Sequence, residues 1–299
     1  MAERSFSWSG YGHDALQRLA APWRLATQLE KLSRIARGAR EAFEFAVLGD
    51  AEPGRYWFSR ALFNRPGVFA RQLSAIQSQP VDFMIQLGDM VSCGRPNLYQ
   101  RFFEQLEGVG ISKPYLTVLG NHDRSNPHGG SHSRLYRSLF GRSNYHFDYG
   151  GVRFVVLDSS RQRVTKAQLK WLSMVFDTPL RKLVFTHIPP VMLRLWGGAV
   201  AHHMGGFSDG AHEFTDLMSD MGVERVYMGH VHGFGVQDYK GVRYILTGGG
   251  GSPLYPCGVE RFHHYLTVSI GPHGISERVH PLDGSSFHIP PGKVLLAEA

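Results

Sequence analysis

The segment VDFMIQLGD, residues 81–89, decides how the rest of the chain is interpreted. It is an apolar run of the length of one buried strand, and it ends in a glycine followed by a carboxylate. A residue at the carboxyl end of a buried strand points into the crevice where open α/β sheets bind ligands. A carboxylate has two oxygens and holds one cation on each, so Asp89 is a candidate bridge between two metal ions.

Four other short apolar runs end in similar chemistry. Their ends are Gly49-Asp50-Ala51-Glu52, Gly120-Asn121-His122-Asp123, Thr186-His187 and Gly229-His230-Val231-His232. Taken alone, such an Asp more often caps a helix, such a His is more often a hydrogen-bonded core residue, and such an Asn more often shapes a turn. Five strand ends with metal-ligand side chains are improbable as a coincidence. We therefore expect one metal site built from residues 50 to 232.

Length alone allows two domains in 299 residues, but these candidate ligands must converge, which favours one domain around the site. We assign residues 43–275 to this domain, residues 1–42 to an N-terminal arm with a basic amphipathic helix, and residues 276–299 to a C-terminal tail packed on or extending from the domain. The two cysteines do not form a disulfide framework and are expected to be free. Without an apolar run of membrane-spanning length or a signal peptide, a cytoplasmic location is expected.

The net charge of +7 suggests an anionic partner. No Lys/Arg run of the nucleic-acid-binding type is present, and we expect no dedicated nucleic-acid binding. In the N-terminal region, Leu25, Leu29, Leu32 and Ala36 recur at helical spacing among basic residues. This helix either packs on the domain or lies on a membrane or a partner protein.

Buried runs alternate with helical segments from residue 43 onward. Strands are predicted at 43–48, 81–87, 115–119, 145–149, 152–157, 182–185, 225–228, 242–246 and 261–270, and helices at 66–78, 98–106 and 166–176. This alternation favours parallel strands covered by helices. Gly150-Gly151 predicts a tight hairpin, so the sheet is expected to be mixed.

The motifs, in this order, resemble those of the calcineurin-like metallophosphoesterases, which include the purple acid phosphatases. The match comprises Gly88-Asp89 with Gly94, Gly120-Asn121-His122-Asp123, His187 and Gly229-His230-Val231-His232, with further similarity at 145–159 and 248–251. It covers residues from about 43 to 270. The resemblance implies an α/β fold, a four-layer α-β-β-α sandwich of two mixed β-sheets flanked by helices, with two metal ions where strand ends meet.

The resemblance also implies a division of the ligands between two metal ions. One ion would take Asp89, Asn121, His187 and His230, and the other Asp50, Asp89 and His232. A hydroxide held by both ions would then attack the phosphorus of a phosphomonoester or phosphodiester.

Two residues next to ligand Asn121 are candidates for catalysis. His122 would hydrogen-bond the phosphoryl group or protonate the leaving oxygen, and Asp123 would orient its imidazole.

Glu52 stands where the family usually has a histidine. If Glu52 binds the metal, its oxygen ligand favours manganese or iron over zinc. The added negative charge would raise the pKa of the bridging water, so we expect an alkaline activity optimum. The alternative is that Glu52 points away and this metal position is weak or empty.

Substrate-binding candidates lie in two segments. Arg55, Tyr56, Trp57 and Arg60 follow the first motif and combine phosphate-binding with aromatic side chains, although they would equally suit a packed helix start. A long Gly-rich connection at 194–212 contains Trp196, His202 and His203 and is interpreted as a substrate-binding loop. We interpret its histidines as loop residues and not as metal ligands.

The sequence therefore predicts a dinuclear-metal phosphoesterase acting on a small phosphorylated substrate. The alternatives are a hydrolase of a lipid-linked phosphate or pyrophosphate at a membrane surface, contacted through residues 1–42, a non-catalytic scaffold with a degraded metal site, and a nuclease with a basic groove. The sequence does not indicate the oligomeric state.

Overall fold

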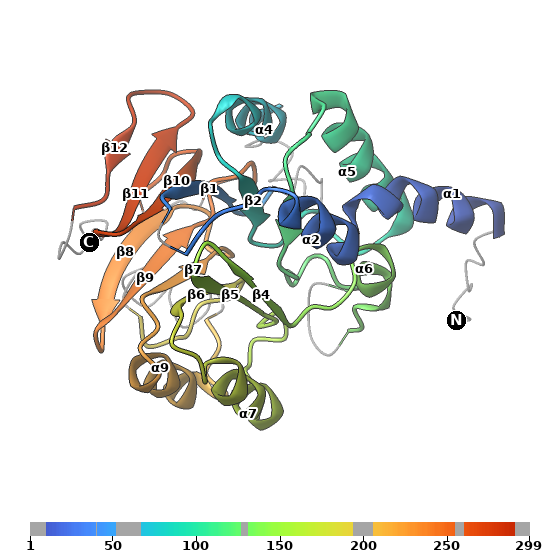
Figure 1. Ribbon diagram of the computed structural model, residues 1–299. Helices are drawn as coiled ribbons and strands as arrows, with labels where there is room; N and C mark the ends of the chain where they lie inside the picture. The colour runs from blue at the N-terminus through green and yellow to red at the C-terminus, as the bar shows by residue number, and fades with distance from the viewer. Residues whose placement is uncertain are drawn as a thin grey trace.

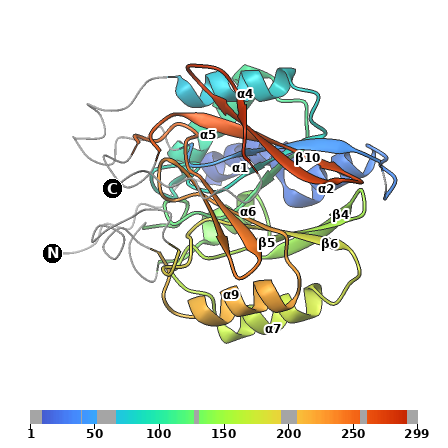
Figure 2. The same cartoon turned by 90° about the vertical axis from the view of Figure 1, so that its left-hand side faces the viewer.

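A computed structural model describes residues 10–39, 41–51, 67–126, 131–193, 206–254 and 260–290 (Figure 1). These residues form two six-stranded sheets that pack face to face. Helix α4 covers the outer side of one sheet, and α7 and α9 cover the outer side of the other (Figure 2). The four-layer α-β-β-α sandwich expected from the sequence is confirmed.

The first sheet has the strand order β12-β11-β10-β1-β2-β3. The strands β1 (Phe43–Leu48), β2 (Phe83–Gln86) and β3 (Tyr115–Thr117) run parallel to one another. The strands β10 (His264–Gly271), β11 (Gly274–Pro281) and β12 (Phe287–His288) continue the sheet in antiparallel fashion from β1. The parallel strands are therefore those that lead into the first three motifs.

The second sheet has the strand order β4-β5-β6-β7-β9-β8. Its central strands β5 (Val152–Leu157), β6 (Arg181–Thr186), β7 (Arg225–Met228) and β9 (Val242–Thr247) are parallel. Its edge strands β4 (Tyr145–Tyr149) and β8 (Phe234–Tyr239) are antiparallel to their neighbours. Tyr149 pairs with Val152, which confirms the hairpin predicted at Gly150-Gly151.

Aromatic side chains fill the space between the sheets. Phe45 stacks on Phe83 with ring centroids 5.1 Å apart, and Phe154 stacks on Phe185 at 5.9 Å. Both pairs are fully buried. Because these rings come from inward-facing positions of both sheets, they fix how the sheets are packed and where their strand ends meet.

Helices bury the outer faces of the sandwich. The helices α1 (Gly10–Ala20), α4 (Val68–Ser78), α5 (Pro96–Val109) and α6 (Arg134–Leu139) contribute to the outer core of the first sheet. The helices α7 (Lys166–Val175) and α9 (Ala211–Asp220) do so for the second sheet. The short 3-10 helix η1 (Ala21–Trp23) joins α1 to α2 (Leu25–Ser33).

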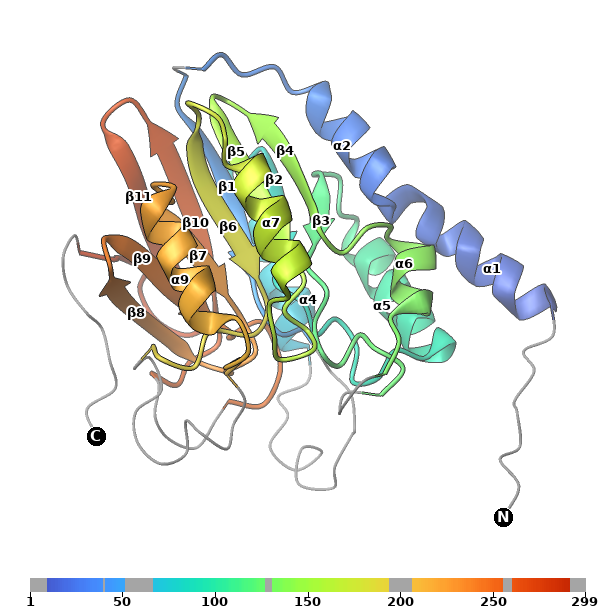
Figure 3. The same cartoon turned by 90° about the horizontal axis from the view of Figure 1, so that it is seen from below.

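The N-terminal helices pack on the domain through their apolar side. Trp23 is buried in the outer core, and Leu32 enters the core between the sheets. Gln28 of α2 accepts a hydrogen bond of 2.6 Å from the backbone N–H of Tyr115 in edge strand β3. Figure 3 shows α1 and α2 running along this side of the sandwich. The segment thus covers a sheet edge that would otherwise expose unpaired backbone groups.

Several elements were not predicted from the sequence. They are α1, η1, β8, β11, β12, α6 and α9. The predicted boundary between residues 275 and 276 lies inside β11, and the predicted loop at 194–212 overlaps the start of α9 at Ala211. Within the described ranges, no helix combines the length and the apolar character needed to span a bilayer.

A candidate metal centre at the strand ends

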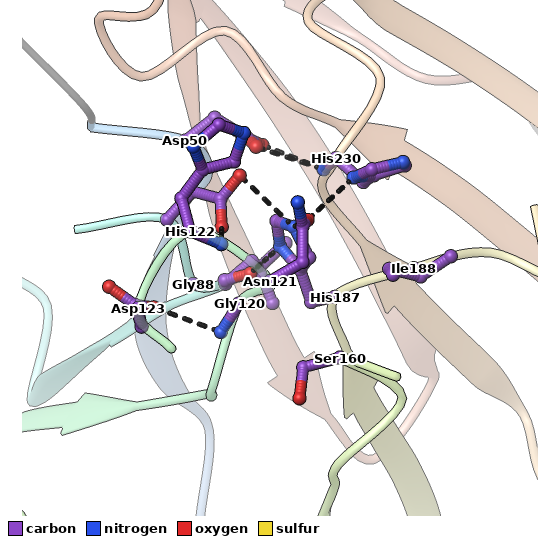
Figure 4. A network of polar contacts seen from close by, with 12 residues as sticks. Asp50, Gly88, Gly120, Asn121, His122, Asp123, Ser160, His187, Ile188 and His230 are labelled. Atoms are coloured by element: carbon purple, nitrogen blue, oxygen red, sulfur yellow. Dashed lines mark hydrogen bonds and ion pairs between the residues drawn. The ribbon is translucent and has the colours of Figure 1, made fainter. Parts of the chain in front are cut away.

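The candidate ligands all follow parallel strands. Asp50 lies just after β1, Asp89 after β2, Asn121 after β3, His187 after β6 and His230 after β7. The carboxyl ends of these strands meet at one edge of the sandwich, and the labelled side chains converge there (Figure 4). Both sheets therefore contribute to the centre.

Two groups of ligand atoms share Asp89. Asp89, His187 and His230 form one group, and Asp50, Asp89 and His232 form the other, with the ligand atoms of each group within 4.8 Å of one another. Asp50, Asp89, His187 and His232 are buried, and His230 is partly buried. Such buried Asp and His groups are suited to hold metal ions.

The hydrogen bonds of His187 leave one ring nitrogen for a metal ion. Its Nδ1 lies 2.7 Å from the carbonyl oxygen of Leu87 and must donate, because a carbonyl only accepts. Its Nε2 lies 3.3 Å from Oδ2 of Asp89. Without a metal ion the protonated ring donates from Nε2 to this carboxylate, and once that proton is lost the nitrogen lone pair and the carboxylate oxygen both suit a metal ion.

His232 has the same arrangement in the second group. Its Nδ1 lies 2.7 Å from the carbonyl oxygen of Pro253, and its Nε2 faces Oδ1 of Asp50 at 3.6 Å. The amide oxygen of Asn121 lies 3.0 Å from Nε2 of His187 and 3.0 Å from Nδ1 of His230. Lone-pair atoms therefore converge in both groups, and the residues present fit two cations.

The electrostatics of the centre point the same way. Burial raises the pKa of Asp50, and although His187 opposes this effect, Asp89 adds to the rise. Burial would also raise the pKa of Asp89, but the charge and hydrogen bond of His187, together with the charges of His122 and His230, outweigh burial and lower the pKa. Burial would lower the pKa of His187, but Asp89 raises it to about 9. The two buried carboxylates thus favour positive charge between them, which a bound cation supplies.

The backbone is strained where it presents the ligands. Asp50, Asp89 and His230 have positive φ angles of 27°, 48° and 70°. Non-glycine residues seldom adopt this conformation, and the surrounding structure must hold them in it. Gly120 packs directly against Asp89. A Cβ atom at Gly120 would lie 2.2 Å from both the backbone N and Oδ1 of Asp89. Only glycine allows the ends of β2 and β3 to approach so closely.

The structure corrects the expected partnership of His122 and Asp123. Nδ1 of His122 lies 2.9 Å from the carbonyl oxygen of Ser92, which holds the ring. The carboxylate of Asp123 instead accepts hydrogen bonds from the backbone N–H groups of Met90 at 2.9 Å and Gly120 at 2.9 Å. Asp123 therefore fixes the loops that follow β2 and β3, and the hydrogen bond that orients the imidazole is the one to Ser92.

The remaining predicted site residues lie outside the described residues. These are Glu52, Arg55, Tyr56, Trp57, Arg60, Trp196, His202 and His203. The preference for manganese or iron rests on Glu52 and stays a prediction. Sequence reasoning did not identify the carbonyl groups of Leu87, Ser92 and Pro253, which orient the three imidazoles. No side-chain signal marks such a role, because every residue has a carbonyl group.

Comparison with known proteins identifies one family. The family model for calcineurin-like phosphoesterases matches residues 43–234. A nucleotide pyrophosphatase/phosphodiesterase from Hordeum vulgare is 25% identical over 58% of this chain and 58% of its own length. A probable cyclic nucleotide phosphodiesterase from Psychrobacter is 26% identical over 58% of this chain and 54% of its own length. The chain thus spans little more than half the length of these curated relatives.

Among solved structures, a purple acid phosphatase from yellow lupin (Lupinus luteus) seeds superposes with a TM-score of 0.69. The match covers 85% of this chain and 54% of the lupin chain at 17% sequence identity. At this identity the likeness concerns the fold, and it agrees with the arrangement of two sheets between helical layers.

Proposed function

We propose, because the chain belongs to the calcineurin-like phosphoesterase family, that it hydrolyses phosphoester bonds with two metal ions bound at the Asp and His centre. One observation carries the proposal. Two groups of ligand atoms share Asp89, and in each group an imidazole fixed by a backbone carbonyl turns its Nε2 toward a carboxylate oxygen. Metal binding accounts for this arrangement, because imidazole nitrogens and carboxylate oxygens converge as sets of ligand atoms.

Each ion would have its own set of ligands. Asp89, Asn121, His187 and His230 would hold one ion, and Asp50, Asp89 and His232 the other. When bound, two such ions lower the pKa of a water molecule between them and offset negative charge on the phosphoryl oxygens. The buried aspartates and the fixed imidazoles keep the ligand positions in place before substrate arrives.

His122 is positioned to act on the substrate. Its backbone N–H donates to Oδ1 of Asp89 at 2.9 Å, which ties this residue to the bridging carboxylate. Because Nδ1 donates to Ser92, Nε2 is the ring atom that takes up a proton and passes it to the leaving oxygen. Asp123 supports this step indirectly, by holding the loops on both sides of His122.

The substrate is proposed to be a small phosphorylated molecule, with phosphodiesters favoured over monoesters. The names of the barley and Psychrobacter relatives both refer to phosphodiesterases, and both include nucleotides. We extend the activity stated in those two names to this chain, which matches only part of each relative. The N-terminal helices bury Trp23 and Leu32 against the domain, so the structure offers no separate support for the lipid-linked alternative.

The test measures turnover and metal content together. Protein reconstituted with manganese is assayed with para-nitrophenyl phosphate and with bis(para-nitrophenyl) phosphate, and bound metal is counted by mass spectrometry. We expect about two ions per chain and faster turnover of the diester. Asp89→Asn should lose metal and reduce kcat by at least about a thousandfold.

Asp177→Asn is the matched control, because Asp177 is exposed after α7 and lies outside the centre. It should keep both the metal and the activity. Full turnover by Asp89→Asn, or wild-type protein that binds no divalent ion, would contradict the proposal.

A further inference from the structure

A polar pocket with a volume of about 300 Å³ lies between the loop that carries Arg124 and the segment that follows β5. Four arginines line it: Arg124, Arg137, Arg161 and Arg163. Asp158 is the one carboxylate among the residues that line this pocket. The described lining thus carries an excess of three positive charges, which suits an anionic ligand.

The pocket lies at the same edge of the sandwich as the metal centre. Arg124 directly follows Asp123, and its Nη1 donates to Oγ of Ser160 at 3.0 Å. The adjacent Ser159 accepts a hydrogen bond of 2.7 Å from the backbone N–H of Ile188, the residue after His187. Figure 4 shows Ser160 and Ile188 beside the convergent side chains.

Strand geometry gives the approximate separation of the two sites. Asp158 directly follows β5, which pairs with β6, and β6 leads to His187. Neighbouring strands are about 5 Å apart, so the backbone that carries Asp158 lies about one strand spacing from the backbone that carries His187. One small molecule with two anionic groups spans this distance.

Arg124 is a buried cation to which no carboxylate of the described residues is hydrogen-bonded. Its side chain is 2% exposed, and its guanidinium donates to the carbonyl oxygen of Ser131 and to the hydroxyl of Ser160. Burial lowers the pKa of Arg124, and the charges of Arg161 and Arg137 lower it further against the opposing effect of Asp158. A buried charge with only neutral hydrogen-bond partners is costly unless a counter-charge approaches.

The other three arginines also have no acidic partner among the residues that the structure describes. Within the described ranges, Arg137, Arg161 and Arg163 form no ion pair with a carboxylate, and Arg161 donates only to the carbonyl oxygen of Ser131 at 3.3 Å. Asp209 pairs with Arg163 through a backbone β-bridge. Asp158 accepts hydrogen bonds from the backbone and hydroxyl of Ser160. The guanidinium groups are therefore available to an added anion.

We propose that this arginine pocket binds a second phosphate group of the substrate while the ester bond lies at the metal centre. The inference rests on the proposed phosphoesterase function and narrows its substrate to small molecules that carry a further phosphate group besides the ester that is cleaved. Phosphate is favoured over carboxylate because its higher charge matches the excess of positive charge in the pocket, and a guanidinium group suits the planar spacing of two phosphate oxygens.

The first experiment measures binding without metal. Chelator-treated protein is titrated with inorganic phosphate by calorimetry, so the result does not depend on metal-centre activity. We expect a Kd of about 1 mM or tighter for the wild type. In the double variant Arg161→Gln/Arg163→Gln the Kd should rise at least about tenfold, because two of the phosphate-binding groups are lost.

Arg71→Gln/Arg101→Gln is the matched control. It removes two charges from exposed positions on α4 and α5 that do not line the pocket, and its Kd should stay unchanged. Absence of phosphate binding by the wild type, or equal losses in both double variants, would overturn the proposal. Acetate binding as tight as phosphate binding would overturn the assignment to a phosphate.

The second experiment compares two matched diesters. These are the para-nitrophenyl ester of thymidine 5′-phosphate and the same ester with an additional 3′-phosphate. The wild type should show a lower KM for the bisphosphate, and Arg161→Gln/Arg163→Gln should remove that preference. Equal KM values in the wild type would overturn the substrate assignment. If neither ester is turned over, the proposed function fails while the phosphate titration still decides whether the pocket binds phosphate.

Discussion

The carboxylate of Asp50 accepts a hydrogen bond from the backbone N–H of His230, with N–O distances of 3.0 Å to Oδ1 and 2.9 Å to Oδ2, although 180 residues separate them. Asp50 follows β1 of the first sheet, and His230 follows β7 of the second. Both residues have positive φ angles. The hydrogen bond therefore joins two strained strand ends across the interface between the sheets, directly beside the candidate ligand atoms.

Replacing Asp50 by Asn should weaken metal binding at one of the two positions and leave the other occupied. An amide oxygen still accepts from the backbone of His230, but the negative charge that would hold the second ion is lost. We expect metal content to fall from two ions to about one per chain and kcat to fall by about a hundredfold. Mass spectrometry and steady-state kinetics on the same preparation check this, and retention of both ions would contradict it.

Gly120→Ala should be strongly destabilising. The new Cβ would lie 2.2 Å from Asp89, so the end of β2 or β3 must shift. We expect the free energy of unfolding in urea to fall by about 2–3 kcal/mol, as for overpacked cores. Gly108→Ala is the control, because Gly108 lies in α5 with open space around its Cβ position. That variant should gain about 0.5–1 kcal/mol, and equal behaviour of the two variants would contradict the prediction.

Asp82 should contribute to the loss of stability in acid. Burial would raise its pKa, but hydrogen bonds from Arg37, at 2.8 and 2.7 Å, and Tyr149, at 2.8 Å, outweigh burial and lower the pKa. Since the unfolded pKa is about 3.9, this contribution is fully present above about pH 5 and is lost as pH falls through the lower folded value.

The Asp82→Asn variant tests this directly, because its side chain is neutral at every pH. Wild type should have the higher urea midpoint at neutral pH, and the difference between the two proteins should shrink as the wild-type carboxyl becomes protonated below about pH 4. A difference that stays constant to about pH 2 would show that the charge on Asp82 does not contribute.

Leu32 should attach the N-terminal helices to the domain. Its side chain is 3% exposed and enters the core between the sheets, whereas Leu29 on the same helix is only partly buried. We expect Leu32→Ala to lower the free energy of unfolding by about 2–4 kcal/mol, and Leu29→Ala by about 1 kcal/mol or less. Urea unfolding followed by tryptophan fluorescence compares them, and equal losses would indicate that α2 packs differently.

The strands that carry the motifs could be predicted well from the sequence. The strands β1, β4, β5 and β7 have the predicted bounds, since runs rich in apolar residues, or in β4 an alternation of aromatic and polar residues, end at glycine or polar residues. The missed strands carry a weaker pattern. In β8, Gln237 and Asp238 interrupt the apolar residues, and β11 has mostly exposed or partly exposed positions. These segments form strands because β8 pairs with β9 and β11 pairs with β10. Such pairing cannot be predicted from local composition.

In the site, the side chains proposed to bind metal could be predicted from the sequence, whereas the roles that depend on backbone partners could not. The order of motifs brought together Asp50, Asp89, Asn121, His187 and His230 as one cluster, which the structure places at one sheet edge. The role of Asp123 could not be predicted, because its partners are backbone N–H groups from two loops. Arg124 was also overlooked, although it stands next to a recognised motif. Its significance depends on Arg161 and Arg163, which come from another strand end.

The spread of the ligands over both sheets has a consequence for the order of folding. No local segment contains a complete set, and the Asp50–His230 contact spans 180 residues. Contacts between residues so far apart in the chain form late, because much of the chain must be ordered first. The centre thus comes into existence only after the two sheets have docked. Metal ions would then be captured by a folded chain and would contribute little to the speed at which that chain folds.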